Sequence, residues 1–294
     1  MRGSSHSFWH YAPFVMTSEA KTLQRGGCTI AYETGGAAGA ETVVLLHGFG
    51  MSRDSMRALA HDLRGLGAAG RTLVADARGH GETRCGEAEA LDYPEMRGDL
   101  HALLEREAPG GAHLVGHSMG GQIALVEAIA HPELVRSLAL IGAGPCRAIT
   151  EERERKSWER AAVGFEAASR EELCASLASA APTKSPELAP ETLYGDALGP
   201  NLARVVRDGF LHVEGNDDAC RAVRAPAVLL VGRDDRTWLE PTRSLASLLP
   251  GAELHVVPDA GHLVHLEHAS TCAARVAEGI RGAIREGASR TERS

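Results

Sequence analysis

A serine flanked by glycines is the most informative feature of the sequence. The run GHSMGG at 116–121 follows a short apolar segment, 112–115, and precedes a helical pattern, 122–130. Gly-x-Ser-x-Gly between a strand and a helix is typical of a sharp turn that exposes a nucleophilic serine. Glycine is needed there because side chains at the flanking positions would collide with nearby backbone. The pattern predicts that Ser118 attacks a substrate, beside a helix amino end whose dipole favours a developing negative charge.

A serine hydroxyl needs a base to remove its proton and an acid to orient that base. The strand-like segment 226–231 is followed by two acids, Asp234 and Asp235, and the strand-like segment 253–257 is followed by His262. Loops after the strands of a parallel sheet meet at one edge. We therefore expect the serine, one of the two acids and the histidine to come together at that edge.

The loop after the apolar segment 42–47 is a candidate for binding a negatively charged oxygen. It reads HGFG at 47–50, and its glycines allow backbone N–H groups to face a pocket. One donor of such an oxyanion hole normally belongs to the residue after the nucleophile. We assign the backbone N–H groups of Phe49 and Met119 to this role.

The elements that position these residues alternate along the chain. Short apolar runs, such as 42–47, 71–76 and 135–141, are separated by helical patterns such as 54–66. This alternation predicts an α/β fold with a mostly parallel, doubly wound sheet that helices cover on both faces.

The pattern changes within 145–225, where amphipathic stretches broken by prolines contain no convincing strand. This segment is predicted to form a helical lid inserted into the core, which comprises 17–144 and 226–288. Residues 1–16 differ in composition from the rest, and their first four residues, MRGS, favour an added tag or a disordered arm.

Composition narrows the functional classes. A net charge of −8 and a pI near 6.0 argue against a nucleic-acid partner. No apolar run reaches the ~20 residues that span a bilayer, so no membrane partner is expected. The six cysteines contain no CxxC pair, which predicts reduced structural thiols and neither a metal nor a redox centre. We expect a cytoplasmic monomer or homodimer that acts on a small molecule without a metal or organic cofactor.

Together, the motifs resemble those of the α/β-hydrolase superfamily, in particular its compact serine esterases and enol-lactonases with a helical cap. The matching motifs occur in the family's order over roughly residues 22–287: HGFG at 47–50, DARGHG at 76–81, GHSMGG at 116–121, GRDD at 232–235 and AGH at 260–262. The resemblance implies the α/β-hydrolase fold. It also selects Asp235 over Asp234, because the family's acid usually stands three residues after the glycine that closes its strand.

The resemblance implies acyl transfer by a catalytic triad of Ser118, Asp235 and His262, whereas Asp76 and His80 are expected to be structural. A carbon–carbon bond hydrolase and a lyase of the menaquinone-synthesis type, which use the same triad, stay open. So does a ligand-binding receptor without turnover, although the complete triad argues against it.

Substrate choice is expected to depend on the lid and the pocket rim. Arg147 and Arg233 are candidates for pairing with a substrate carboxylate. The aromatic content of only 4% favours a mainly aliphatic pocket and a small-to-medium hydrophobic ester or lactone. The aromatic candidates for substrate contact are Trp158, Phe165, Phe210 and Trp238.

Overall fold

The computed structural model describes residues 18–183, 185 and 188–291. The tag or arm predicted for residues 1–16 lies outside this part of the chain. A central sheet has the strand order β1-β2-β4-β3-β6-β7-β8-β9, and β5 pairs with β2 beside this path. Strands β1, β2 and β5 pair antiparallel, and the others pair parallel. The strands are β1 Ser18–Arg25, β2 Cys28–Gly36, β3 Thr42–Leu46, β4 Arg71–Ala75, β5 Arg84–Cys85, β6 Ala112–His117, β7 Val135–Ile141, β8 Ala227–Gly232 and β9 Glu253–Val257.

Helices cover both faces of the sheet, which explains why its central strands are continuous apolar runs. In β3, Val44 and Leu46 pack into one apolar cluster and Val43 and Leu45 into the other, since successive side chains point to opposite faces. Helices α2 (Tyr93–Glu107), α3 (Met119–Ala130) and α9 (Leu239–Leu248) cover the first face. Helices α1 (Asp54–Gly65), α10 (Val264–Glu267) and α11 (Ala269–Thr291) cover the second. The predicted doubly wound α/β architecture is confirmed.

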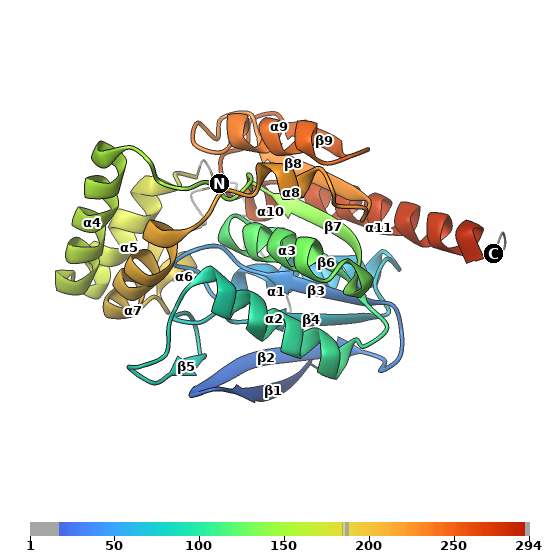
Figure 1. The fold of residues 1–294 in the computed structure, drawn as a ribbon, viewed down its shortest axis with the longest axis horizontal. Helices are drawn as coiled ribbons and strands as arrows, with labels where there is room; N and C mark the ends of the chain where they lie inside the picture. The colour runs from blue at the N-terminus through green and yellow to red at the C-terminus, as the bar shows by residue number, and fades with distance from the viewer. Residues whose placement is uncertain (1–17, 184, 186–187, 292–294) are drawn as a thin grey trace, which may run out of the picture.

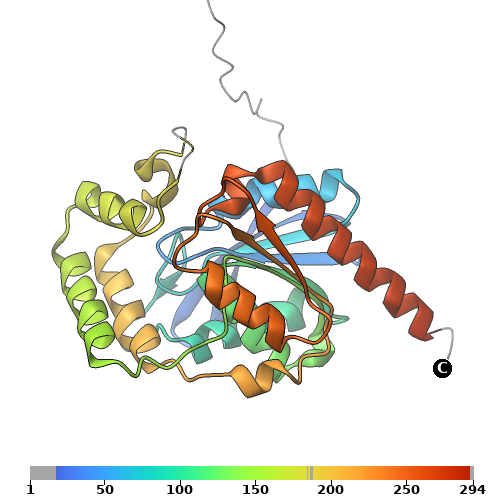
Figure 2. The same cartoon turned by 90° about the horizontal axis from the view of Figure 1, so that it is seen from above.

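The chain between β7 and β8 forms a helical insertion with an apolar cluster of its own. Its helices α4, α5, α6 and α7 gather at one end of the molecule, whereas α11 extends at the other (Figures 1 and 2). Phe165, Leu173 and Leu202 form part of its core and pack with Met51 and Leu263 from the sheet domain. The helices are α4 Glu152–Ala167, α5 Arg170–Ala180, α6 Pro190–Tyr194, α7 Gly199–Arg204 and α8 Asp217–Cys220, with a π turn at Val205–Gly209 and a 3₁₀ turn at Phe210–His212.

The prediction that all cysteines are reduced is wrong for Cys28 and Cys85, which form a disulfide. These residues are 57 positions apart, but the antiparallel pairing of β5 with β2 aligns them at a Cα–Cα distance of 4.1 Å. Spacing along the chain does not reveal a partner that sheet pairing supplies. The other four cysteines are buried free thiols: Cys146, Cys174, Cys220 and Cys272. Disulfides persist mainly in oxidising compartments, so this bond argues against the predicted cytoplasmic location.

Thiol titration tests this pairing. Protein that is purified without reductant and then unfolded is expected to show four reactive thiols, because two of the six cysteines are bonded to each other. After reduction it should show six. Reduction should lower the free energy of unfolding by about 2–4 kcal/mol, since the bond closes a long loop in the unfolded chain. The Cys28→Ser/Cys85→Ser double variant, the control, should show four thiols under both conditions. Six thiols in the unreduced wild type would contradict the pairing.

No helix within the described part of the chain is both long and apolar enough to cross a membrane.

Candidate active site

The glycine-flanked serine lies in the sharp turn between β6 and α3. Ser118 has the backbone angles φ 51° and ψ −116°, a left-handed conformation that costs a non-glycine residue about 1–3 kcal/mol. A Cβ on Gly116 would overlap the Gly120 carbonyl group, and one on Gly120 would lie 2.5 Å from the Leu46 oxygen. The Ser118 N–H donates to the Ile141 carbonyl oxygen of β7 at 2.9 Å. The neighbouring strands therefore hold the serine in its strained conformation.

Asp235 and His262 meet at the ends of β8 and β9. The His262 Nδ1–H donates to Asp235 Oδ2 at 2.7 Å, and the Trp238 N–H donates to Asp235 Oδ1 at 3.0 Å. Asp235 is only 5% exposed, whereas its neighbour Asp234 is exposed. A proton on Nδ1 leaves Nε2 of the neutral imidazole as an acceptor. This tautomer is the one that a base acting on a serine requires.

Ser118 and His262 line one cavity of about 400 Å³ between the sheet edge and the helical insertion. Within the described part of the chain, Ser118 Oγ and His262 Nε2 have no hydrogen-bond partner and are not bonded to each other. Catalytic hydrogen bonds often tighten only when substrate binds. The arrangement thus presents a hydroxyl and an imidazole acceptor to the same cavity.

Phe49 and Met119 also line this cavity. Their backbone N–H groups have no acceptor among the described residues. Phe49 lies in the loop after β3, and Met119 is the first residue of α3. The loop packs directly on the turn, because a Cβ on Gly48 would lie 3.4 Å from the Cβ of Ser118. Two unpaired donors therefore flank the serine, as an oxyanion hole requires.

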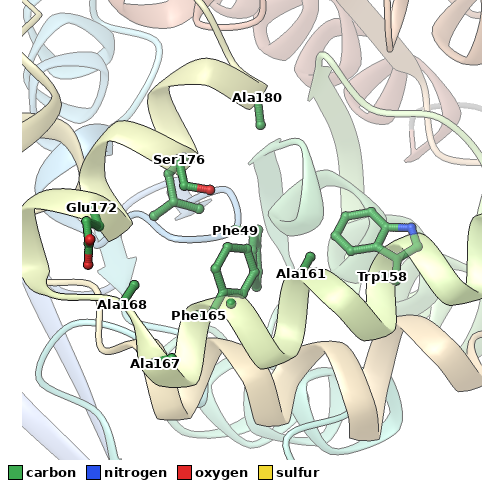
Figure 3. Close-up of a pocket in the computed structure, with 11 residues that line it drawn as sticks. Phe49, Trp158, Ala161, Phe165, Ala167, Ala168, Glu172, Ser176 and Ala180 are labelled. Atoms are coloured by element: carbon green, nitrogen blue, oxygen red, sulfur yellow. The ribbon is translucent and has the colours of Figure 1, made fainter.

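The aromatic residues expected to contact substrate line two neighbouring cavities, and Trp158 lines both. Trp158, Phe210 and Trp238 line the cavity that contains Ser118, and Trp238 stacks on the His262 ring with centroids 6.0 Å apart. Phe165 does not line it but faces a neighbouring cavity (Figure 3). Phe165 lies seven residues after Trp158 on α4, which is about 10 Å along a helix axis.

Sequence reasoning missed a buried polar pair on the cavity wall. Tyr93 Oη donates to Gln122 Oε1 at 2.6 Å, and Gln122 Nε2 donates to the Pro145 carbonyl oxygen at 3.3 Å. Gln122 lies four residues after Ser118, about one helical turn. This spacing places both residues on the same side of the helix and could have identified Gln122 from the sequence. Arg147 lines the same cavity with an exposed side chain, whereas Arg233 does not line it.

A group of buried histidines packs behind the His262 imidazole. The His117 ring lies 4.7 Å from that of His262 and 4.3 Å from that of His265, and its Nε2–H donates to the His262 carbonyl oxygen at 3.1 Å. Neither ring nitrogen of His265 has a partner within the described chain. Burial lowers the pKa of His265 to about 3, helped by the nearby His262, and lowers the pKa of His117 well below its usual value. Both rings are neutral at neutral pH and act as packing.

Asp76 and His80, predicted to be structural, do not line the cavity. Asp76 accepts hydrogen bonds from the Arg53 and Glu82 N–H groups at 2.7 and 2.9 Å, and it pairs with the Arg53 guanidinium. Burial lowers the pKa of His80 to about 3. Both residues stabilise the turn after β4 through hydrogen bonds.

The buried histidines His80 and His265 are expected to make the protein less stable in mild acid. The pKa values of His80 and His265 are about 3 in the folded state and about 6.5 in the unfolded state. Below pH 6.5 the unfolded chain therefore binds more protons, and each group lowers the free energy of unfolding by on the order of 1 kcal/mol at pH 5.5. The pKa values of His47 and His117 are also lowered and act in the same direction.

We expect the free energy of unfolding, measured with urea, to be about 2–3 kcal/mol lower at pH 5.5 than at pH 8. The His265→Leu variant should reduce this difference by on the order of 1 kcal/mol, the contribution of one such group. The control is His61→Gln on α1, whose side chain is 44% exposed. Equal pH dependence in His265→Leu and wild type would contradict the assignment.

One group among the described residues has the side chains to hold a metal ion. The donor atoms of His101, Glu127 and His131 lie within 4.8 Å of one another, on and just after helices α2 and α3. His101 Nδ1 lies 2.9 Å from the Glu127 carboxylate, which also receives Arg97 at 3.4 Å. None of the three lines the cavity that contains Ser118, so this group lies apart from the candidate active site.

Comparisons with known proteins agree with this geometry. A model of the alpha/beta hydrolase family matches residues 43–275. The 2-hydroxy-6-oxononadienedioate/2-hydroxy-6-oxononatrienedioate hydrolase of Paraburkholderia phymatum is 30% identical over 86% of this chain and 92% of its own. A thermophilic esterase from Thermogutta terrifontis has a TM-score of 0.79 at 22% identity, over 90% of this chain and 99% of its own. The enol-lactonase of Burkholderia xenovorans LB400 has a TM-score of 0.76 at 19% identity, over 89% and 100%. The two solved structures share the fold.

Proposed function

Because the chain belongs to the alpha/beta hydrolase family, we propose that this enzyme is a serine hydrolase that cleaves a carboxylic ester or lactone through an acyl-enzyme. One observation carries the proposal. The pair formed by Asp235 and His262, 2.7 Å apart, opens onto the cavity that also exposes Ser118. Nucleophile, base and orienting acid come from three loops at one sheet edge, and they follow the chain order Ser…Asp…His of the α/β-hydrolase fold.

The chemistry follows from these positions. His262 Nε2 removes the Ser118 proton as the hydroxyl attacks the carbonyl carbon, and Asp235 stabilises the imidazolium that forms. The N–H groups of Phe49 and Met119 donate to the oxyanion, and each such donor lowers the barrier by about 3–4 kcal/mol. His262 then gives its proton to the leaving alcohol. A water molecule, activated by the same imidazole, releases the acid and restores Ser118.

The size and lining of the cavity support a small-to-medium, mainly hydrophobic substrate. About 400 Å³ lies within the usual ~300–1,000 Å³ of small-molecule sites. Aromatic and aliphatic side chains form most of the wall. The buried hydrogen bond between Tyr93 and Gln122 adds a polar feature to a wall that also contains Arg147 and Glu154.

A burst experiment tests the proposal. Mixing the enzyme with p-nitrophenyl butyrate should release about one equivalent of p-nitrophenol rapidly if deacylation is slower than acylation. A fluorophosphonate should add once, and peptide mass spectrometry should locate the adduct on Ser118. Failure to cleave any activated ester, together with failure to form this adduct, would overturn the proposal and favour a ligand-binding receptor.

A second candidate, carbon–carbon bond hydrolysis, is favoured by the relative from Paraburkholderia phymatum, whose name describes a hydrolase of 2-hydroxy-6-oxononadienedioate. Arg147 at the cavity offers a guanidinium group that pairs well with carboxylates. The assay follows the loss of absorbance of that dienol acid. If the enzyme turns over this compound faster than p-nitrophenyl butyrate, and if Arg147→Gln abolishes that turnover, carbon–carbon bond hydrolysis would replace ester hydrolysis as the proposed function.

A further inference from the structure

A second cavity of about 620 Å³ lies in the helical insertion, between α4 and α5. Figure 3 shows Trp158 and Ala161 projecting from one helix and Ser176 and Ala180 from the other, with Phe49 between them. We call this cavity the α4–α5 groove. Its α4 side includes Ala161, Gly164 and Ala168, residues that offer a single methyl group or none. These small residues leave room beside the rings of Trp158 and Phe165.

The α4–α5 groove adjoins the cavity that contains Ser118. Four residues line both: Phe49, Trp158, Leu177 and Ala180. Phe49 marks the junction, because its backbone N–H is the proposed oxyanion donor and its ring lies 6.0 Å from that of Phe165 inside the groove. The groove therefore begins beside the proposed oxyanion donor.

We propose that the α4–α5 groove binds the linear alkyl chain of the substrate. The inference rests on the proposed ester hydrolysis and makes the substrate a medium-chain ester. Small apolar side chains next to the rings of Phe49, Phe165 and Trp158 fit a flexible methylene chain. The polar groups of Glu172 and Ser176 lie on the α5 side, and the Glu172 carboxylate already accepts the Ser169 N–H at 2.8 Å. A neutral chain end suits this surface, whereas a second carboxylate would be repelled by it.

The first arm of the test measures kcat/KM for p-nitrophenyl esters from acetate to dodecanoate. Each methylene that enters the groove should raise kcat/KM by about fourfold, the value of its burial, until the groove is filled. The alkyl chain can belong to the acid or to the alcohol, so the second arm measures alkyl acetates from ethyl to dodecyl. A rise in one series only assigns the groove to that half of the ester.

Gly164→Leu is designed to block the groove. A Cβ on Gly164 meets no atom within 4 Å, so the position has room for a side chain, and leucine is a better helix former than glycine. In the series that rises, kcat/KM for the ten-carbon chain should fall at least tenfold, while kcat/KM for the two-carbon chain stays within twofold. Ala161→Leu, a second variant on the same wall, should act in the same direction.

Two controls separate blocking from a general effect on α4. Gly164→Ala improves the helix but adds only a methyl group, so it should change the ratio of the ten-carbon to the two-carbon substrate less than threefold. Val163→Leu adds bulk at a position that is 61% exposed and does not line the groove, so it should leave the ratio unchanged. Unchanged ratios in both Gly164→Leu and Ala161→Leu would overturn the inference.

The outcomes distinguish this inference from the proposed function. Ser118-dependent cleavage of short esters without any rise along either series would overturn the groove and leave ester hydrolysis standing. If no ester is cleaved, the proposed function fails, and calorimetric titration with decanoate tests the groove directly. Binding by wild type that is lost in Gly164→Leu would support the groove, and no binding by either protein would overturn it.

Discussion

Replacement of Ser118 by alanine is expected to lower kcat for an activated ester by about 10⁵–10⁶-fold. The loss is large because the triad acts as a unit: without the hydroxyl, His262 has no proton to remove and no acyl-enzyme forms. The measurement is steady-state hydrolysis of p-nitrophenyl butyrate. Ser247→Ala, at an exposed position of α9, is the matched control and should retain wild-type activity. Retention of more than about one-hundredth of the wild-type rate by Ser118→Ala would exclude Ser118 as nucleophile.

The backbone of the same residue adds a stability readout. Alanine and serine are both strained at φ 51°, whereas glycine adopts positive φ freely. We therefore expect Ser118→Gly to be inactive but more stable to urea than Ser118→Ala by about 1 kcal/mol. Equal stability of the two variants would show that the turn carries no such strain.

Replacement of Asp235 by asparagine is expected to lower kcat by about 10⁴-fold. An asparagine amide turned toward His262 presents N–H groups to Nδ1, and this favours the tautomer that carries its proton on Nε2. That tautomer cannot accept the Ser118 proton. Burial of Asp235 and its bond to the Trp238 N–H hold the replacement in the same place, so the fold should be retained.

Asp234→Asn is the matched control, because it makes the same chemical change one residue earlier at an exposed position. Its kcat should stay within about threefold of wild type, since surface substitutions rarely disturb a site. Both variants are compared by ester hydrolysis from pH 7 to pH 9, with melting temperatures measured in parallel. A large loss in Asp234→Asn and a small one in Asp235→Asn would reverse the assignment of the acid.

Much of the fold was predictable because its central strands are buried on both faces. A run such as Thr42–Leu46, in which every residue is buried, leaves little choice but a covered parallel strand. The edge strand β1, Ser18–Arg25, was not predicted, because it is mostly exposed and polar and has no apolar run. It is held by pairing with β2, a non-local contact that local sequence does not encode.

In the candidate site, too, some features could be predicted from the sequence and others could not. Ser118, Asp235 and His262 each follow a strand, so parallel topology alone brings their loops to one edge. The pairing of Cys28 with Cys85 depends on the register between β2 and β5, which spacing along the chain does not fix. The placement of Phe165 depends on how α4 packs over the loop after β3, and amphipathic periodicity leaves that packing open. Features that depend on the relative position of two elements were therefore the ones that sequence reasoning missed.

The helical insertion between β7 and β8 has an evolutionary consequence. The insertion enters after Ile141 and returns at Ala227, and none of Ser118, Asp235 and His262 belongs to it. Mutations within α4 and α5 can therefore change which substrates bind, while selection preserves the proposed catalytic residues. Alanine and glycine codons become valine codons by one nucleotide change, so the alanines and the glycine that line α4 are a short mutational step from a narrower groove. We expect orthologous and paralogous genes to differ first in chain-length range and last in reaction type.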